Sequence, residues 1–236
     1  MTHHVRRLIG TIAVLVAGIA GTAQGYTTGN LLTDPSFENN ALIFFANIIA
    51  PPYTENAWGA ENGSIVGAEN AVTPADGSKM LRMLASGATS QAWQLINLNA
   101  YSTDINAGLA TMDLQILFNV PATVAAGQSA QTLQFYDALH VQIGPLFQAD
   151  SNTTYGALDA LANTWQPLNL TGIPIPVNTV YVLTQVYFGS VSIGLSPGYV
   201  DDAHLTLTAV PEPSSIALVA LGLVGVGIGR ARRRAA

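Results

Sequence analysis

Cysteine is absent from this chain of 236 residues, and only 9% of its residues are charged. Without cysteine there is no disulfide, no thiolate zinc site and no cysteine nucleophile, so the fold rests on packing, with or without a metal ion. Low charge in a chain rich in Gly, Asn, Thr and Ser is typical of exported β proteins rather than of cytosolic enzymes. The length fits one globular domain with short targeting segments.

Basic residues are scarce in the middle of the chain. Between Tyr26 and Val210 the basic side chains are Lys79 and Arg82, against thirteen of the fourteen carboxylates. Such a surface repels nucleic acid, so we expect no nucleic-acid partner. An acidic surface of this kind either holds calcium or serves solubility alone.

The common catalytic motifs are also absent. The chain has no Gly-x-Ser-x-Gly, His-Glu-x-x-His, Walker or dinucleotide-binding pattern, and after residue 25 its histidines are His140 and His204. We expect both histidines on strands, with His204 on the sheet surface beside Asp202. The interpretation is a noncatalytic protein; a pair of carboxylates acting on a glycan is the alternative, because the sequence gives no distances between acids.

Residues 1–25 have the pattern of a cleaved secretory signal peptide. A basic start precedes an apolar run over 8–20, and small residues follow it. Cleavage after Ala23 and cleavage after Gly25 both suit the small-residue rule. A permanent N-terminal anchor is the alternative, although the apolar run is short for a membrane span.

Residues 210–236 form a second targeting segment, after a domain that we place at 26–209. An apolar stretch over 214–229 and a basic end over 230–236 follow a proline-rich motif. Prolines end the folded domain, the apolar stretch enters lipid as a transmembrane helix, and the arginines stay in the cytoplasm, which leaves the domain outside. The motif consists of Val210, Pro211, Glu212 and Pro213.

This order of motif, apolar run and arginine cluster resembles the PEP-CTERM sorting signal of Gram-negative bacteria. The resemblance implies recognition by an exosortase, cleavage near the motif and an intermediate in the inner membrane. It further implies delivery to the cell surface or to an extracellular exopolysaccharide matrix. The similar part covers residues 210–236 and says nothing of what the domain binds.

The domain itself shows short apolar stretches separated by Gly, Pro, Asn and Ser, with no long helical period. Alternation is clearest over 180–187, where both faces carry large side chains, as in a strand of a two-sheet sandwich. We therefore expect an all-β fold, an antiparallel β-sandwich. The expected strands are 43–49, 80–84, 92–98, 112–120, 132–143, 179–188 and 203–207, with one short helix at 155–163.

Three short segments resemble the jelly rolls of galactose-binding-like domains and carbohydrate-binding modules. They are residues 30–38 at the opening strand, 76–82 at an early turn into a strand, and 198–207 at the closing strand. The resemblance implies a jelly-roll fold.

The same resemblance implies a structural calcium ion that ties the first strand to the last. Calcium takes carboxylate and carbonyl oxygens as ligands. The alternative is that the glutamate caps or pairs locally and that the two aspartates form a solvated strand end. The matching positions are Glu38, Asp201 and Asp202, with the backbone carbonyls of Ser78 and Lys79.

Sugar-binding faces need exposed aromatic rings flanked by polar groups. Tyr53 and Trp58, in a Pro- and Asn-rich loop, are the candidates, and core packing is the alternative for each. The hypothesis is an exported, noncatalytic surface or matrix protein that binds glycans or exopolysaccharide. A secreted glycan-active enzyme on the same scaffold is the alternative.

Overall fold

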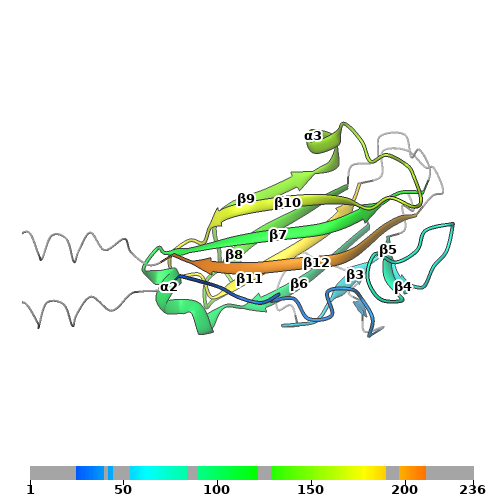
Figure 1. Cartoon of the computed structure of the whole chain (residues 1–236). Coiled ribbons are helices and arrows are strands. Elements are labelled where there is room, and N and C mark those ends of the chain that lie inside the picture. The colour runs from blue at the N-terminus through cyan, green and yellow to red at the C-terminus, as the bar shows by residue number, and fades with distance from the viewer. Residues whose placement is uncertain are drawn as a thin grey trace, which may run out of the picture. The chain divides into compact units, whose positions relative to one another are not determined.

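The computed structural model describes residues 25–39, 42–44, 54–83, 90–121, 129–189 and 197–210. Its contacts separate one compact unit, Thr27–Ala209, from the two terminal segments. This unit consists of two β-sheets packed face to face (Figure 1). The predicted antiparallel β-sandwich is confirmed.

Sheet A contains the last strand of the domain near its centre. Its order is β10-β7-β12-β5-β4, and β1 also pairs with β12. Its strands are β1 (Tyr26–Thr27), β4 (Gly63–Val66), β5 (Met80–Met83), β7 (Ala110–Asn119), β10 (Gln166–Pro174) and β12 (Gly198–Ala209).

Sheet B has the order β2-β3-β6-β11-β8-β9 and is antiparallel apart from the short β2–β3 pair. Its strands are β2 (Ile43–Phe44), β3 (Gly59–Glu61), β6 (Ser90–Asn97), β8 (Ser129–Tyr136), β9 (Gln142–Asp150) and β11 (Tyr181–Phe188). Three short helices connect strands. They are η1 (Asn99–Tyr101) and α2 (Ser102–Asn106) between β6 and β7, and α3 (Ser151–Tyr155) between β9 and β10.

Strand alternation decides which side chains enter the core between the sheets. On β7, Met112, Leu114, Ile116 and Phe118 are buried, while the residues between them face outward or lie at intermediate depth. The Phe118 ring lies 5.8 Å from the ring of Phe188 on β11, so the two sheets touch through aromatic side chains. The outer face of β7 is left for polar residues.

Most predicted strands exist, but the strand predicted at 132–143 is wrong. The chain turns between β8 and β9, because the Asp137 carboxylate accepts hydrogen bonds from the N–H groups of Leu139 (2.8 Å) and Val141 (2.9 Å). Strand β10 was not expected, since Pro167, Gly172 and Pro174 indicate a break. It lies at the edge of sheet A, where prolines are tolerated.

The helix predicted at 155–163 is also wrong. Helix α3 begins earlier, because the Asp150 side chain caps it by accepting the N–H of Thr153 at 2.9 Å. The helix stops before Gly156. This residue has a φ of 79°, which glycine adopts without the steric cost that a side chain would add.

The targeting segments fall mostly outside the described residues, as do positions 45–49 and 84 of two predicted strands. Of the predicted signal peptide, the structure describes Gly25, and of the sorting motif it describes Val210. Among the residues that the structure describes, no helix has the length and apolar character of a membrane span.

Gly59 provides a test of the packing in sheet B. It lies opposite Trp93 of β6, and a methyl group at position 59 would come within 2.6 Å of that buried indole. We expect Gly59→Ala to lower the free energy of unfolding by about 1–3 kcal/mol, because a buried ring must shift. Urea denaturation followed by circular dichroism measures this. Gly29→Ala, with open space around position 29, is the control, and equal effects of the two would contradict the packing.

Candidate ligand-binding groove

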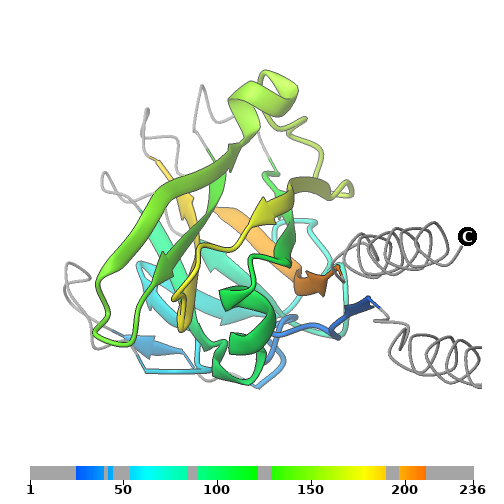
Figure 2. The same cartoon turned by 90° about the vertical axis from the view of Figure 1, so that its left-hand side faces the viewer.

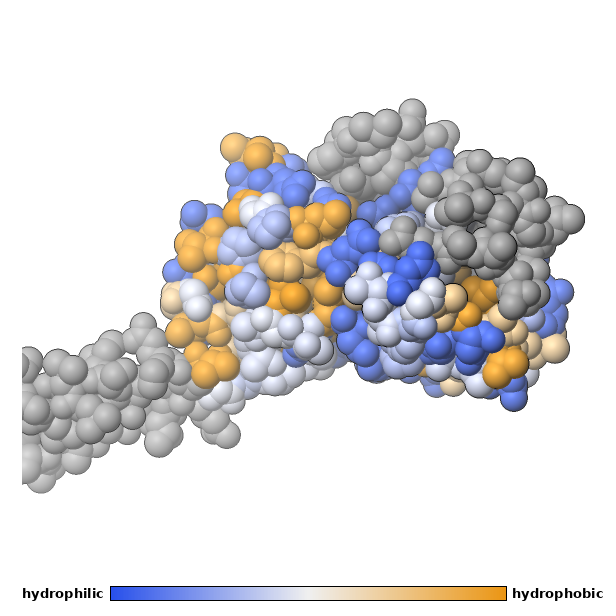
Figure 3. Space-filling model, turned by 90° about the horizontal axis from the view of Figure 1, so that it is seen from above, coloured by the Kyte–Doolittle hydropathy of each residue, from blue (hydrophilic) through white to orange (hydrophobic). Residues whose placement is uncertain are grey.

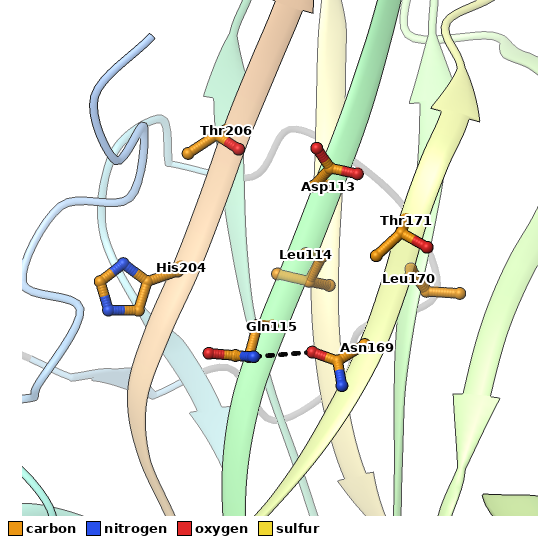
Figure 4. Close-up of a pocket in the computed structure, with 8 residues that line it drawn as sticks. All are labelled: Asp113, Leu114, Gln115, Asn169, Leu170, Thr171, His204 and Thr206. Carbon is orange, nitrogen blue, oxygen red and sulfur yellow. Dashed lines mark hydrogen bonds between the residues drawn. The ribbon is translucent and has the colours of Figure 1, made fainter. Parts of the chain in front are cut away.

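A groove of about 210 Å³ lies on the outer face of sheet A, across β12, β7 and β10 (Figure 4). Its position on three adjacent strands means that its side chains come from distant parts of the sequence. The lining residues are Asp113, Leu114, Gln115, Asn169, Leu170, Thr171, His204 and Thr206.

A cross-strand row of polar side chains forms the centre of the groove. Gln115 lies opposite His204 on one side and Asn169 on the other. All three are exposed, and the Gln115 amide nitrogen donates to the Asn169 amide oxygen at 2.8 Å (Figure 4). This bond leaves the Asn169 amide nitrogen and the Gln115 amide oxygen as a donor and an acceptor for a ligand.

A β-bulge flanks the groove on each side. In β10 the register shifts between Leu170 and Ile173, and the N–H of Gly172 (φ 63°) donates to the Asp113 carboxylate at 2.6 Å. In β12 the register shifts between Asp201 and His204. Bulges redirect side chains, so these two set the outward directions of the groove's polar groups.

His204 stands on the outer surface beside Asp202, as predicted. Its Nε2 lies 2.8 Å from an Asp202 carboxylate oxygen, and its Nδ1 lies 3.5 Å from the Asn30 amide nitrogen. The imidazole therefore has a fixed orientation at the edge of the groove.

The groove's chemistry is that of a hydrogen-bonding surface. Its lining offers two amides, two hydroxyls, one imidazole and one carboxylate, and it contains no Phe, Tyr or Trp. Hydrolysis of a glycoside needs two carboxyl groups on either side of the bond, and this lining has Asp113 alone. The arrangement suits binding of a polar ligand.

Sequence reasoning placed His204 on the sheet surface beside Asp202 but did not predict this groove, and it missed Asp113, Gln115 and Asn169. A polar residue at every second position of a strand indicates only a solvent-facing side. The pairing of three separate strands, which brings these residues together, leaves no local signal.

The predicted calcium ligands Glu38, Ser78 and Lys79 do lie together, at the turn 75–79. The Glu38 carboxylate accepts hydrogen bonds from the Ser78 hydroxyl (2.8 Å) and from the N–H groups of Ser78 (2.8 Å) and Lys79 (2.7 Å). These bonds, with the Ser78 hydroxyl foremost, hold the pKa of Glu38 below its usual range. The Lys79 ammonium donates to the Glu38 carbonyl at 2.7 Å.

Asp201 contacts the other side of the turn 75–79. Its buried carboxylate accepts the N–H groups of Ala75 (2.7 Å), Asp76 (3.2 Å) and Asp202 (2.8 Å). Burial raises the pKa of Asp201 to about 7, although the three N–H bonds act in the opposite direction. The Asp202 side chain instead pairs with His204 on the outer face.

These hydrogen bonds hold the turn through the chain's own groups. The Glu38 carboxylate and carbonyl and the Asp201 carboxylate already accept protein donors, which favours the alternative of local pairing at Glu38. Across the described part of the chain, no group of three or more His, Asp or Glu side chains could hold a metal. Calcium binding stays a prediction.

The prediction that Trp58 offers an exposed platform is wrong. Its side chain is 2% exposed, its indole N–H donates to the Asp34 carbonyl at 3.0 Å, and its ring lies 5.0 Å from that of Phe37. Trp58 therefore anchors the opening segment in the core. Tyr53 lies outside the described residues.

Thermal unfolding tests the turn 75–79. Because the chain's own donors occupy its oxygens, we expect the midpoint to agree within about 1 °C between calcium and chelator. Calcium at a hundred times its Kd would instead raise the midpoint by roughly 5–10 °C. A rise of that size, lost in Asp201→Ala, would confirm the calcium prediction and contradict the expectation from these contacts.

Comparison with known proteins shows a sorting signal and a fold. Residues 209–234 match the PEP-CTERM protein-sorting motif, and no curated protein matches the chain. A motif of this kind implies exosortase processing and indicates export and sorting to the cell surface in Gram-negative bacteria. The predicted sorting signal is confirmed.

Solved structures with the same architecture are mainly carbohydrate-binding modules. TmCBM61, solved in complex with β-1,4-galactotriose, is 13% identical with a TM-score of 0.50, over 75% of this chain and 98% of that chain. A xylan-binding domain from CBM 22 is 14% identical with a TM-score of 0.38, over 75% and 96%. A putative sugar-binding protein from Bacteroides thetaiotaomicron VPI-5482 is 10% identical with a TM-score of 0.43, over 75% and 98%. The two packed sheets, together with the likeness to TmCBM61, agree with the predicted jelly-roll fold.

Proposed function

We propose that the chain is an exported, noncatalytic glycan-binding protein of the cell surface or extracellular matrix, and that it binds exopolysaccharide. The observation that carries this proposal is the polar groove on the outer face of sheet A. The sorting motif supports delivery to the compartment in which extracellular glycans occur.

The groove's groups match the hydroxyls of a sugar. The Asn169 amide nitrogen donates to a hydroxyl oxygen, and the Gln115 amide oxygen accepts from its neighbour, while the Gln115–Asn169 bond holds both amides in place. Thr171, His204 and Thr206 add further polar contacts around them.

Affinity for a single sugar unit is expected to be weak. Each hydrogen bond contributes about 0.5–1.5 kcal/mol net, and the groove has no aromatic platform to add apolar contact. A polysaccharide presents many equivalent units, so several protein copies on one polymer gain avidity without a tighter site.

The tail accounts for delivery in this proposal. An exosortase recognises the segment 210–213 while the apolar run over 214–229 lies in the inner membrane, and cleavage near the motif frees the domain for the surface. The order of motif, apolar run and arginines supports this sequence of events.

Substitutions in the central row test the binding site. We expect Asn169→Ala and Gln115→Ala each to weaken binding to the producing bacterium's exopolysaccharide by roughly 5–10-fold, through loss of one hydrogen bond. Affinity electrophoresis in a gel containing the polymer measures this. Thr111→Ala, on the outer side of β7 but outside the groove, is the control. A folded protein with no affinity for the polymer would remove the glycan part and leave a structural role.

The alternative of a glycan-active enzyme has its own test. Since Asp113 is the one carboxylate in the groove lining, we expect no release of reducing ends from the exopolysaccharide during long incubation. Turnover that disappears in Asp113→Asn would favour the enzyme and contradict the noncatalytic proposal.

A further inference from the structure

The end of the sandwich at which β12 finishes is formed by neighbouring loops that Figure 2 shows from the front. Ala209 of β12 pairs with Ala110 of β7, and the Ala110 carbonyl accepts the N–H of Ile175 at 3.1 Å. The N–H of Val180 in turn donates to the Tyr136 carbonyl at 2.8 Å. The loops 137–141 and 175–180 therefore lie at the same end of the domain as the last residue of β12, which we call the tail-side end.

Apolar side chains project from the tail-side end into solvent. Leu139 is 82% exposed, Val141 58% and Val177 48%. Seen from above, hydrophobic surface lies over this half of the sandwich (Figure 3). Single exposed apolar residues are ordinary, whereas three on adjoining loops form a candidate contact surface.

Both loops are held in place by hydrogen bonds that direct these side chains outward. Asp137 fixes the loop 137–141 through the N–H groups of Leu139 and Val141. The ring of His140 stacks on that of Tyr181 at 4.5 Å, and the N–H of Asn178 donates to the Asn106 amide oxygen at 2.9 Å. The outward side chains are thus a feature of ordered loops.

Carboxylates lie at both ends of the domain: Glu55, Asp104 and Asp137 lie toward the tail-side end, and another group lies toward the end where β4, β5 and α3 are found (Figure 1). The second group includes Glu61, beside the start of β6, and Glu69, near the end of β7. It also includes Asp150 at the end of β9 and Asp159 near the start of β10. At the tail-side end the carboxylate of Asp137 is engaged by its own loop. The apolar side chains on the loops 137–141 and 175–180 suit a lipid surface.

We propose that the tail-side end faces the bilayer, with Leu139, Val141 and Val177 in the lipid interface. This inference rests on the proposed entry of the tail into lipid. Val210 directly follows β12, and the first apolar side chain of the run over 214–229 is Ile216. A link of about six residues spans at most about 20 Å, so the end of β12 stays within that distance of the membrane. Chain continuity therefore favours lipid over a second copy as the partner.

Lipid-borne quenching tests this, and the absence of native cysteine makes single labels simple to place. The full chain carries an environment-sensitive fluorophore at Leu139→Cys or Val177→Cys, in phosphatidylcholine vesicles with brominated acyl chains. Leu161→Cys is the matched control, because Leu161 is 54% exposed and lies in the loop before β10, at the other end. Ala220→Cys reports whether the tail enters the bilayer.

We expect quenching at positions 139 and 177 to exceed that at 161 at least twofold, with strong quenching at 220. Quenching at 220 together with equal values at 139, 177 and 161 would overturn the inference while leaving tail insertion intact. Absence of quenching at 220 would instead overturn the tail's entry into lipid, on which the inference rests. Circular dichroism of each labelled variant confirms that the sandwich is folded.

Discussion

The domain depends on the hydrogen bonds that Glu38 and Asp201 make to the turn 75–79. This turn joins the opening segment, through Glu38, to the last strand, through the buried carboxylate of Asp201. In a chain without disulfides, these hydrogen bonds tie together residues more than a hundred positions apart. The β12 register shifts directly after Asp201, so this contact lies next to the bulge that separates the buried Asp201 carboxylate from the outward-facing His204. The turn 75–79 thus contacts β12 at the bulge that precedes the groove residue His204.

The protein places its aromatic rings and its polar groups in different locations. Trp58 packs on Phe37, and Trp93 is buried beside Leu95, so these rings stabilise the sandwich. The outer face of sheet A carries amides, hydroxyls and an imidazole instead. Recognition by such a surface depends on the direction of hydrogen bonds, which favours selectivity among hydroxyl arrangements over tight binding. Weak, repeated contacts of this kind fit the proposed binding to a polymer of many equivalent units.

The sequence predicted those strands whose side chains alternate along a short stretch of chain. Alternation over 180–187 predicted β11, because each face of a strand inside a sandwich is covered. The helix and the long strand were misplaced because the Asp137 and Asp150 side chains accept hydrogen bonds from backbone N–H groups, which composition does not reveal. The groove was beyond sequence reasoning: it depends on the register of β12, β7 and β10, and two bulges set that register.

The central position of β12 has a consequence for the order of events during folding. Sheet A needs this strand between β7 and β5, and β1 also pairs with it, yet it is the last strand of the domain along the chain. Pairings between distant segments form late, since the whole intervening chain must be available. Sheet A can therefore be completed only once the residues just before the sorting motif are available to pair with β7 and β5.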